Sequence, residues 1–161
     1  IALDGLWRAW RHIERATRTP GDREARLNMM SASMQGALAF QKGLGAIHSL
    51  SHPVGAVYGT HHGTTNAVVM PAVLDFNRPA IEDRITAAAA YLGIAGGFKG
   101  FRERIVALCS ELAIPPGLAA MGVQATRLDE LTAMALEDPS CGGNPVAMTT
   151  ENTRALFEAA M

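Results

Sequence analysis

Apolar side chains recur at helical spacing along nearly the whole chain, whereas the alternation of β-branched residues that marks a strand never persists. Leu3, Leu6, Trp7 and Trp10 form the first of these apolar stripes. We expect further helices over Arg23–His48, Thr64–Leu74, Ile81–Leu92, Phe98–Leu112 and Leu128–Leu136, and a last one that begins at Thr149 or Thr150. The sequence therefore predicts an all-α fold, a helical bundle.

Short turn signals separate the expected helices. Thr19-Pro20-Gly21-Asp22 is a turn sequence, and Asp22 is a suitable N-cap for the helix that follows. Pro53 is expected to end or kink the second helix, because the residue before a proline is pushed out of the α region. The chain has 161 residues, the length of a single domain, and we expect one domain over residues 1–161.

The composition excludes several classes of partner. With 14 basic and 15 acidic residues, the chain has no strong field that would attract nucleic acid or an anionic membrane. No stretch reaches the roughly 18 apolar residues of a membrane helix, and the first residues lack a signal-peptide pattern. Cys109 and Cys141 are too few for a disulfide framework, which favours a reduced environment. We expect a cytoplasmic protein that binds neither nucleic acid nor membrane.

Four of the five histidines fall between positions 48 and 62: His48, His52, His61 and His62. His48 and His52 are four residues apart and share one face of the helix if it persists that far. His62 follows a glycine-containing loop that is long enough to fold back towards His48. Imidazole is the commonest metal ligand among side chains, so a metal site is one interpretation of the cluster. Hydrogen-bonded histidines of a packed core are the other.

A complete metal site is hard to assemble from this sequence. A catalytic metal usually has three protein ligands and one open position, and a carboxylate is often among the ligands. The carboxylates nearest in sequence, such as Asp75 and Glu82, lie well past the cluster. The chain also begins at Ile1, without an initiator methionine, inside an expected helix. We therefore expect a fragment of a longer protein, with further ligands upstream.

The histidine cluster lies in a longer pattern, Gly-x-x-His-x-x-x-His-Pro-x-Gly followed by His-Gly-x-x-Asn-Ala. Its members here are Gly45, His48, His52-Pro53, Gly55, His62-Gly63 and Asn66-Ala67, followed by Pro71. This pattern resembles that of the iron-containing (group III) alcohol dehydrogenases. The small-residue helix before it and the loop Asp138–Pro145 after it are similar to that family as well, so the resemblance covers nearly the whole chain.

The resemblance implies a role for three histidines. In that family one aspartate and three histidines hold the metal, and the last two histidines match His48 and His62. His52 matches a histidine near the nicotinamide that relays a proton. His61 stands where many members have proline, and we interpret it as a neighbour of the ligand; pairing with His48 is the alternative and requires a different loop register. The remaining ligands and the α/β nucleotide-binding domain would precede Ile1.

The function implied by the resemblance is metal- and NAD(P)-dependent interconversion of an alcohol and an aldehyde or ketone. A divalent cation, Fe²⁺ in the first place and Zn²⁺ as the alternative, acts as a Lewis acid, and NAD or NADP takes the hydride. We expect a homo-oligomer, and no activity from this chain alone. Two alternatives stay open: a non-catalytic helical domain with an incomplete metal site that serves packing or assembly, and a helical metal hydrolase that uses His48, His52 and His62.

Overall fold

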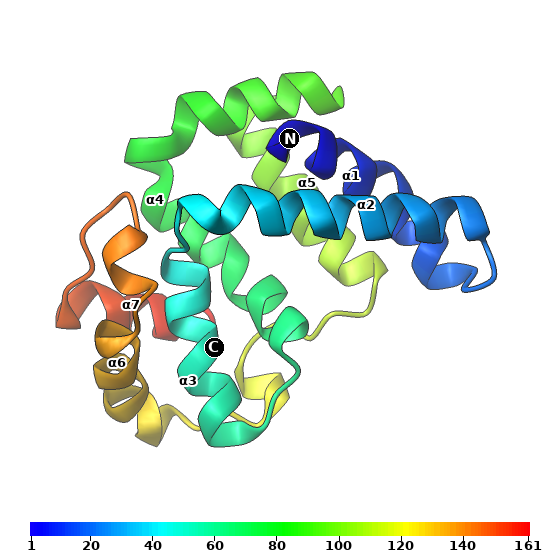
Figure 1. The fold of residues 1–161 in the computed structure, drawn as a ribbon. Helices are drawn as coiled ribbons and strands as arrows, with labels where there is room; N and C mark the ends of the chain where they lie inside the picture. Colours follow the sequence, from blue (N-terminus) through cyan, green and yellow to red (C-terminus); the bar gives the residue numbers. More distant parts are fainter. The chain divides into compact units, whose positions relative to one another are not determined.

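The structure, a computed structural model that describes residues 1–161, is all-helical and confirms the predicted fold class (Figure 1). None of its helices has both the length and the apolar character needed to cross a membrane. The elements in chain order are α1 (Ala2–Arg18), α2 (Arg23–Ala39), η1 (Phe40–Lys42), α3 (Ala46–Tyr58), α4 (His62–Leu92), α5 (Gly97–Glu111), η2 (Ala119–Met121), η3 (Ala125–Arg127), α6 (Leu128–Glu137), η4 (Cys141–Gly143) and α7 (Thr150–Ala159).

The chain divides into two compact units. The first contains Ile1–Lys42 and Asp83–Phe101, and the second contains Gly43–Glu82 and Arg102–Met161. Helix α4 contributes residues to both units. The expectation of a single domain over residues 1–161 stays a prediction. All residues of the histidine cluster belong to the second unit.

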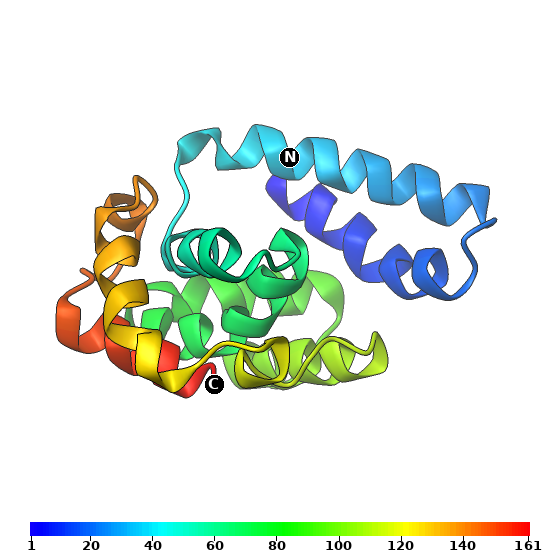
Figure 2. The same cartoon turned by 90° about the horizontal axis from the view of Figure 1, so that it is seen from below.

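In the first unit, α1 and α2 lie side by side along most of their length (Figures 1 and 2). Gly5 permits the close approach, since a Cβ at this position would lie 3.0 Å from the Cβ of Gln35. One carboxylate oxygen of Asp4 accepts hydrogen bonds from Gln35 (2.6 Å) on α2 and from Arg8 (2.8 Å) on its own helix. The two helices are therefore joined by both packing and polar contacts.

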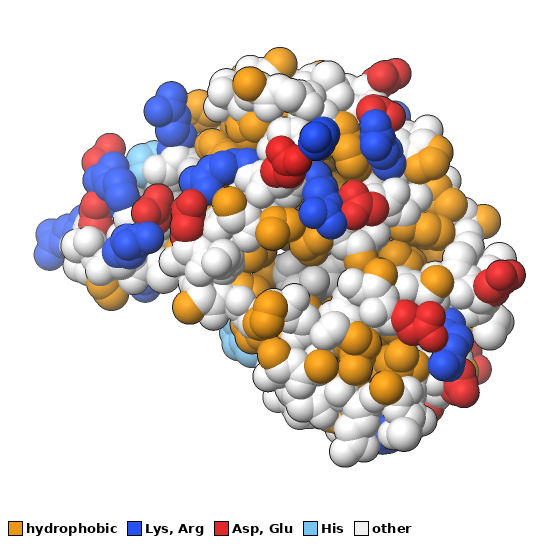
Figure 3. Space-filling model, turned by 180° about the vertical axis from the view of Figure 1, so that it is seen from behind, with side chains coloured by type: hydrophobic (Ala, Val, Ile, Leu, Met, Phe, Trp, Pro, Cys, Tyr) orange, Lys and Arg blue, Asp and Glu red, His pale blue; other side chains and the backbone are white.

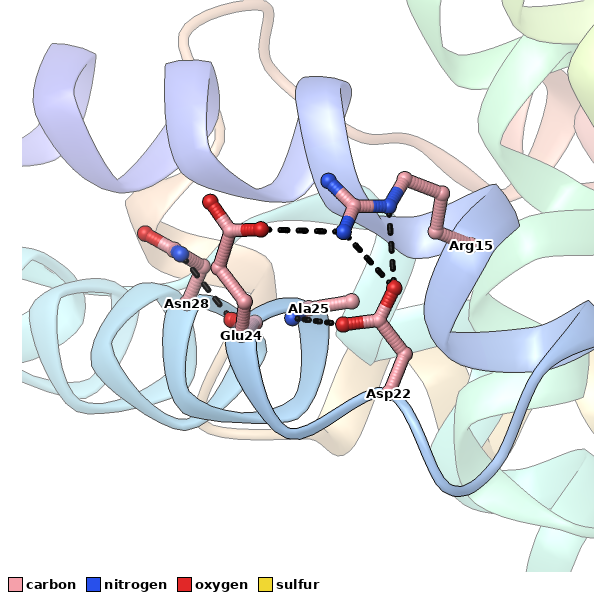
Figure 4. A network of polar contacts seen from close by, with 5 residues as sticks. All are labelled: Arg15, Asp22, Glu24, Ala25 and Asn28. Carbon is pink, nitrogen blue, oxygen red and sulfur yellow. Dashed lines mark hydrogen bonds and ion pairs between the residues drawn. The ribbon is translucent and has the colours of Figure 1, made fainter.

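The turn between α1 and α2 confirms Asp22 as the N-cap. Its carboxylate accepts the backbone N–H of Ala25 (3.0 Å) and also bonds the guanidinium of Arg15 (2.7 Å), which reaches Glu24 as well (3.0 Å; Figure 4). The bond from the Ala25 N–H and the bond from Arg15 hold the pKa of Asp22 below its ordinary value. Asp22 thus both begins α2 and ties it to α1.

The second unit encloses the main hydrophobic core. Its most buried large side chains lie on four different elements and a loop: Leu50 and Val54 on α3, Val69 on α4, Leu118 before η2, Leu131 on α6 and Phe157 on α7. The C-terminal end of the chain closes this core, because the N–H of Leu118 bonds the carbonyl of Ala160 (2.8 Å). On the face drawn in Figure 3, acidic and basic side chains are interspersed, in keeping with the near-zero net charge.

The helix expected over Arg23–His48 is instead broken into α2, η1 and α3. Gly43 has φ of +117°, in the left-handed region that a helix excludes, so the chain turns there. The new helix α3 begins beside Asn144, whose side-chain oxygen accepts the backbone N–H of Ala46 (3.0 Å). The cap comes from a residue 98 positions away, and local patterns cannot reveal it.

Pro53 does not end its helix, which was one of the two outcomes expected there. Helix α3 continues through Pro53 to Tyr58. Helix α4 continues through Pro71 and Pro79, so the two helices expected over Thr64–Leu74 and Ile81–Leu92 are one. A proline inside a helix removes one backbone hydrogen bond. Burial of neighbouring side chains in the core, Val54 beside Pro53 and Val69 and Val73 beside Pro71, outweighs that loss.

Asn144 holds three segments of the second unit together. Besides capping α3, it exchanges two hydrogen bonds with the buried side chain of Asn77 on α4 (2.8 and 2.9 Å) and donates to the carbonyl of Val146 (2.7 Å). A Cβ on Gly45 would lie 2.9 Å from the Asn144 Oδ1, so the contact also needs glycine there. The start of α3 is thereby fixed relative to α4 and to the loop after α6.

We predict that Asn144→Ala lowers the free energy of unfolding by about 2 kcal/mol, because it leaves Asn77 and the Ala46 N–H without their partner. The measurement is chemical denaturation of the purified chain. Gly142→Ala in the same loop is the control, since nothing lies within 4 Å of its added Cβ, and it should stay close to the parent. Equal stability of Asn144→Ala and the parent would contradict the role given to Asn144.

A second prediction concerns pH. Because the folded-state pKa of Asp22 is lowered, its ion pair with Arg15 stabilises the fold above the unfolded pKa of about 3.9 and is lost as pH falls through the folded value. Asp22→Asn keeps an acceptor for the Ala25 N–H but cannot form the ion pair. The unfolding temperature of the variant should lie below the parent's near neutral pH, and the two should converge in acid. A gap that persists unchanged in acid would contradict this assignment.

Candidate metal centre

Three histidines reach the same region of the second unit from two helices. His48 and His52 lie one turn apart on α3, and His62 is the first residue of α4. Between the helices, Gly59 adopts φ of +65° and ends α3 in the left-handed conformation typical of a helix C-cap. This reversal at Gly59 brings the start of α4 back beside α3.

The three imidazoles form a compact triangle. The ring centres of His48 and His62 are 5.3 Å apart, those of His52 and His62 are 5.5 Å apart, and those of His48 and His52 are 5.6 Å apart. Two imidazoles that bind one cation at ordinary metal–nitrogen distances have ring centres about 5 Å apart. The convergence of His48 and His62 expected from the sequence is therefore present.

The surroundings of His48 favour its neutral form. Burial lowers the pKa of His48, and the charges that His62 and His52 would carry lower it further, while Asp138 acts weakly in the opposite direction. A neutral imidazole offers the lone pair that a metal requires. His48 is half-buried, whereas His52 and His62 are exposed, so two of the three rings face an accessible surface.

Asn66, one turn after His62 on α4, contacts the Nε2 of that histidine (3.0 Å). The side-chain oxygen of Asn66 is buried and has no hydrogen-bond partner. Buried side-chain oxygens of folded proteins nearly always have a hydrogen-bond partner, so this one is unusual. The free oxygen of Asn66 fits a site in which a bound group supplies the missing hydrogen bond. No three His, Cys, Asp or Glu side chains of this chain are grouped so that they could hold a metal by themselves.

Asp138 distinguishes His52 from the other two histidines. One of its carboxylate oxygens lies 2.7 Å from the Nδ1 of His52, and the other accepts the backbone N–H of Ser140 (2.8 Å). Burial tends to raise the pKa of Asp138, but the hydrogen bonds from Ser140 and His52 outweigh it and leave the pKa below its ordinary value. Asp138 is therefore a carboxylate that stays ionised beside the histidine triangle.

Sequence reasoning missed Asp138 because it looked for acids near the cluster along the chain. Asp75 and Glu82, the nearest, form ion pairs elsewhere, with Arg102 and Arg78. Asp138 lies 86 positions after His52 and comes close only through the packing of α3 against α6. The one signal that pointed to it was its place at the start of the loop Asp138–Pro145, which is part of the family pattern.

His61 lies outside the triangle. Its Nδ1 accepts the backbone N–H of Thr64 (3.3 Å) and lies 3.2 Å from the hydroxyl of the same residue, so it caps the first turn of α4. This engagement of Nδ1 agrees with the interpretation of His61 as a neighbour of the ligand. The metal-ligand roles of His48 and His62 and the proton relay at His52 stay predictions at this point.

Comparison with known proteins places the chain in a family. The sequence model described as "Fe-containing alcohol dehydrogenase family, C-terminal" matches residues 4–161. A 4-hydroxybutyrate dehydrogenase of Cupriavidus necator is 48% identical over 170 residues, which cover 100% of this chain and 44% of that protein. An NAD-dependent methanol dehydrogenase of Bacillus methanolicus is 35% identical over 93% of this chain and 42% of its own length.

The fold leads to the same family. The crystal structure of a 1,3-propanediol oxidoreductase superposes on 99% of this chain with a TM-score of 0.94 and 27% sequence identity, and the match covers 44% of that protein. The chain thus spans less than half the length of these relatives. With the family model matched over nearly every residue, this chain belongs to the iron-containing alcohol dehydrogenase family and corresponds to its C-terminal region.

Proposed function

We propose that this chain is the metal-holding helical part of an oxidoreductase that interconverts an alcohol with an aldehyde or ketone. The observation that carries the proposal is the convergence of His48 and His62, from different helices, to 5.3 Å between ring centres. In the whole protein, an aspartate, a third histidine and an α/β nucleotide-binding domain would precede Ile1.

His48 and His62 would hold the divalent cation, Fe²⁺ in the first place and Zn²⁺ as the alternative. When bound, such a cation supplies Lewis-acid chemistry, which polarises the oxygen of the alcohol or carbonyl substrate. The chain's own contribution is to present two imidazoles at a fixed separation. The lowered pKa of His48 and the fixed start of α3 both serve this purpose.

His52 would handle the proton that alcohol oxidation releases. Its side chain is 41% exposed, so a proton that it accepts can pass on to water. Imidazole both takes up and gives up protons near neutral pH, which suits this task. The contact with Asp138 gives His52 a partner that the two proposed ligands lack.

The relatives guide the choice of substrate and cofactor. One relative is named for 4-hydroxybutyrate and another for methanol with NAD, so we propose a small primary alcohol as substrate and NAD as the first cofactor to test, with NADP as the alternative. We further propose a cytoplasmic homo-oligomer. Formation of NADH or NADPH from a panel that includes 4-hydroxybutyrate and short alcohols tests this function, and hydrolase activity without it would favour the hydrolase alternative.

A second candidate applies to the chain taken by itself: a non-catalytic helical domain that serves packing or assembly. The observation in its favour is that no three potential ligands of the chain are grouped for metal binding. Elemental analysis of the isolated 161-residue chain separates the two. A tightly bound metal at full stoichiometry in the isolated chain would rule the non-catalytic candidate out.

We predict that His48→Ala in the whole protein removes most of the bound metal and lowers kcat/KM by more than about 100-fold, since it deletes one ligand outright. Metal content by elemental analysis and the initial rate are the two measurements. His61→Ala is the matched control, because His61 is a neighbouring histidine that caps α4, and it should keep its metal. Full metal stoichiometry in His48→Ala would refute the ligand assignment.

His52→Gln should behave differently. We predict that it keeps its metal but lowers kcat by about 10²–10⁴-fold, the usual contribution of general acid–base catalysis, with a much smaller change in KM. Steady-state kinetics together with metal analysis check this. Loss of metal in His52→Gln to the extent expected for His48→Ala would instead make His52 a ligand.

A further inference from the structure

The contact between His52 and Asp138 pairs an exposed histidine with a nearly buried carboxylate. The side chain of Asp138 is 11% exposed and that of His52 is 41% exposed, with 2.7 Å between Oδ2 and Nδ1. The second oxygen of Asp138 is occupied by the Ser140 N–H (2.8 Å), which forms a turn of the Asx type. Each oxygen thus has its own partner, so the carboxylate is held with Oδ2 directed at the Nδ1 of His52.

The elements that carry the pair are themselves tied together on both sides of it. Asp138 directly follows the last residue of α6, and three residues earlier the carbonyl of Ala135 accepts the hydroxyl of Ser49 on α3 (2.5 Å). After Asp138, Asn144 caps the first residue of the same helix α3. Two further hydrogen bonds, one on each side of the pair, therefore hold the segment of Asp138 against the helix of His52.

A carboxylate at Nδ1 determines which nitrogen of a neutral imidazole carries the proton. The carboxylate can only accept, so the proton stays on Nδ1 and Nε2 keeps its lone pair. Neither His48 nor His62 has a carboxylate contact of this kind in the structure, so this arrangement is specific to His52.

We propose that Asp138 is a positioning residue for the reaction: it fixes His52 in the Nδ1–H form, so that Nε2 is the nitrogen that takes the proton released from the alcohol hydroxyl. In that step the O–H bond breaks, an Nε2–H bond forms, and the proton then passes to water, while Asp138 stays ionised throughout. The inference rests on the proposed function, because it assigns the atom through which His52 carries out the proton transfer.

The first test is Asp138→Asn in the whole, metal-loaded protein. The amide oxygen of asparagine can still accept the Ser140 N–H, so the turn is kept, while the carboxylate facing His52 is lost. We expect kcat to fall by about 10- to 100-fold with KM and bound metal close to the parent values. Glu137→Gln, which removes the adjacent exposed carboxylate, is the matched control and should leave kcat unchanged. A parent-like kcat in Asp138→Asn would overturn the proposal.

The second test reads the tautomer directly. In the zinc-loaded protein labelled with ¹⁵N-histidine, long-range ¹H–¹⁵N spectra should show a protonated Nδ1 and an unprotonated Nε2 for His52. In Asp138→Asn the Nε2–H form should appear, since the amide N–H₂ group can donate to Nδ1. An Nε2–H form in the parent, or the same tautomer in both proteins, would overturn the proposal whatever the kinetics show.

The double variant His52→Gln/Asp138→Asn separates action through His52 from a general structural effect. If Asp138 acts only through His52, the double variant has the same kcat as His52→Gln alone. If the double variant instead shows a kcat loss that is the product of the losses of the two single variants, the inference is overturned. If the parent oxidises no alcohol at all, the proposed function fails, while the tautomer spectra still decide whether Asp138 fixes His52.

Discussion

The amide of Asn144 fixes the start of α3, and the geometry of the histidine cluster follows from it. The N–H of Ala46 bonds this amide, and His48 and His52 then follow at positions that the helical repeat determines. The same amide exchanges two hydrogen bonds with Asn77 on α4, the helix that His62 begins. A single side chain therefore forms hydrogen bonds with both helices that supply the proposed ligands. The contact is possible because residue 45 is glycine and leaves room for the amide.

The electrostatics divide three similar side chains into two kinds. The three ring centres lie 5.3–5.6 Å apart, and burial, together with the charges that His62 and His52 would carry, lowers the pKa of His48. One carboxylate enters the cluster, and it contacts only His52. Distances between rings alone do not separate ligands from a proton carrier. The position of Asp138 distinguishes His52 from the other two histidines, which is why we propose His52 as the proton carrier and His48 and His62 as the ligands.

Burial in the core decided where the helices begin and end. The sequence predicts an end or a kink at Pro53 and a break between Leu74 and Ile81, yet α3 passes Pro53 and α4 passes Pro71 and Pro79, because apolar neighbours such as Val54 and Val69 are fully buried. Conversely, the segment Arg23–His48 has continuous helical character, and a single left-handed glycine, Gly43, ends the helix. The cost of one missing hydrogen bond is small beside the burial of a valine, whereas a positive φ cannot be accommodated inside a helix at all.

The sequence by itself determined the helical class, the N-cap at Asp22 and the spacing that puts His48 and His52 on one face, since each depends on residues within a few positions of one another. The resemblance carried by the histidine pattern also identified the family from sequence alone. Only the tertiary structure decided that Asn144 caps α3 and that Asp138 meets His52, contacts that span 98 and 86 positions. Hydrogen bonds between distant segments leave no periodic trace in a sequence, because they depend on how the helices pack and not on how each one forms.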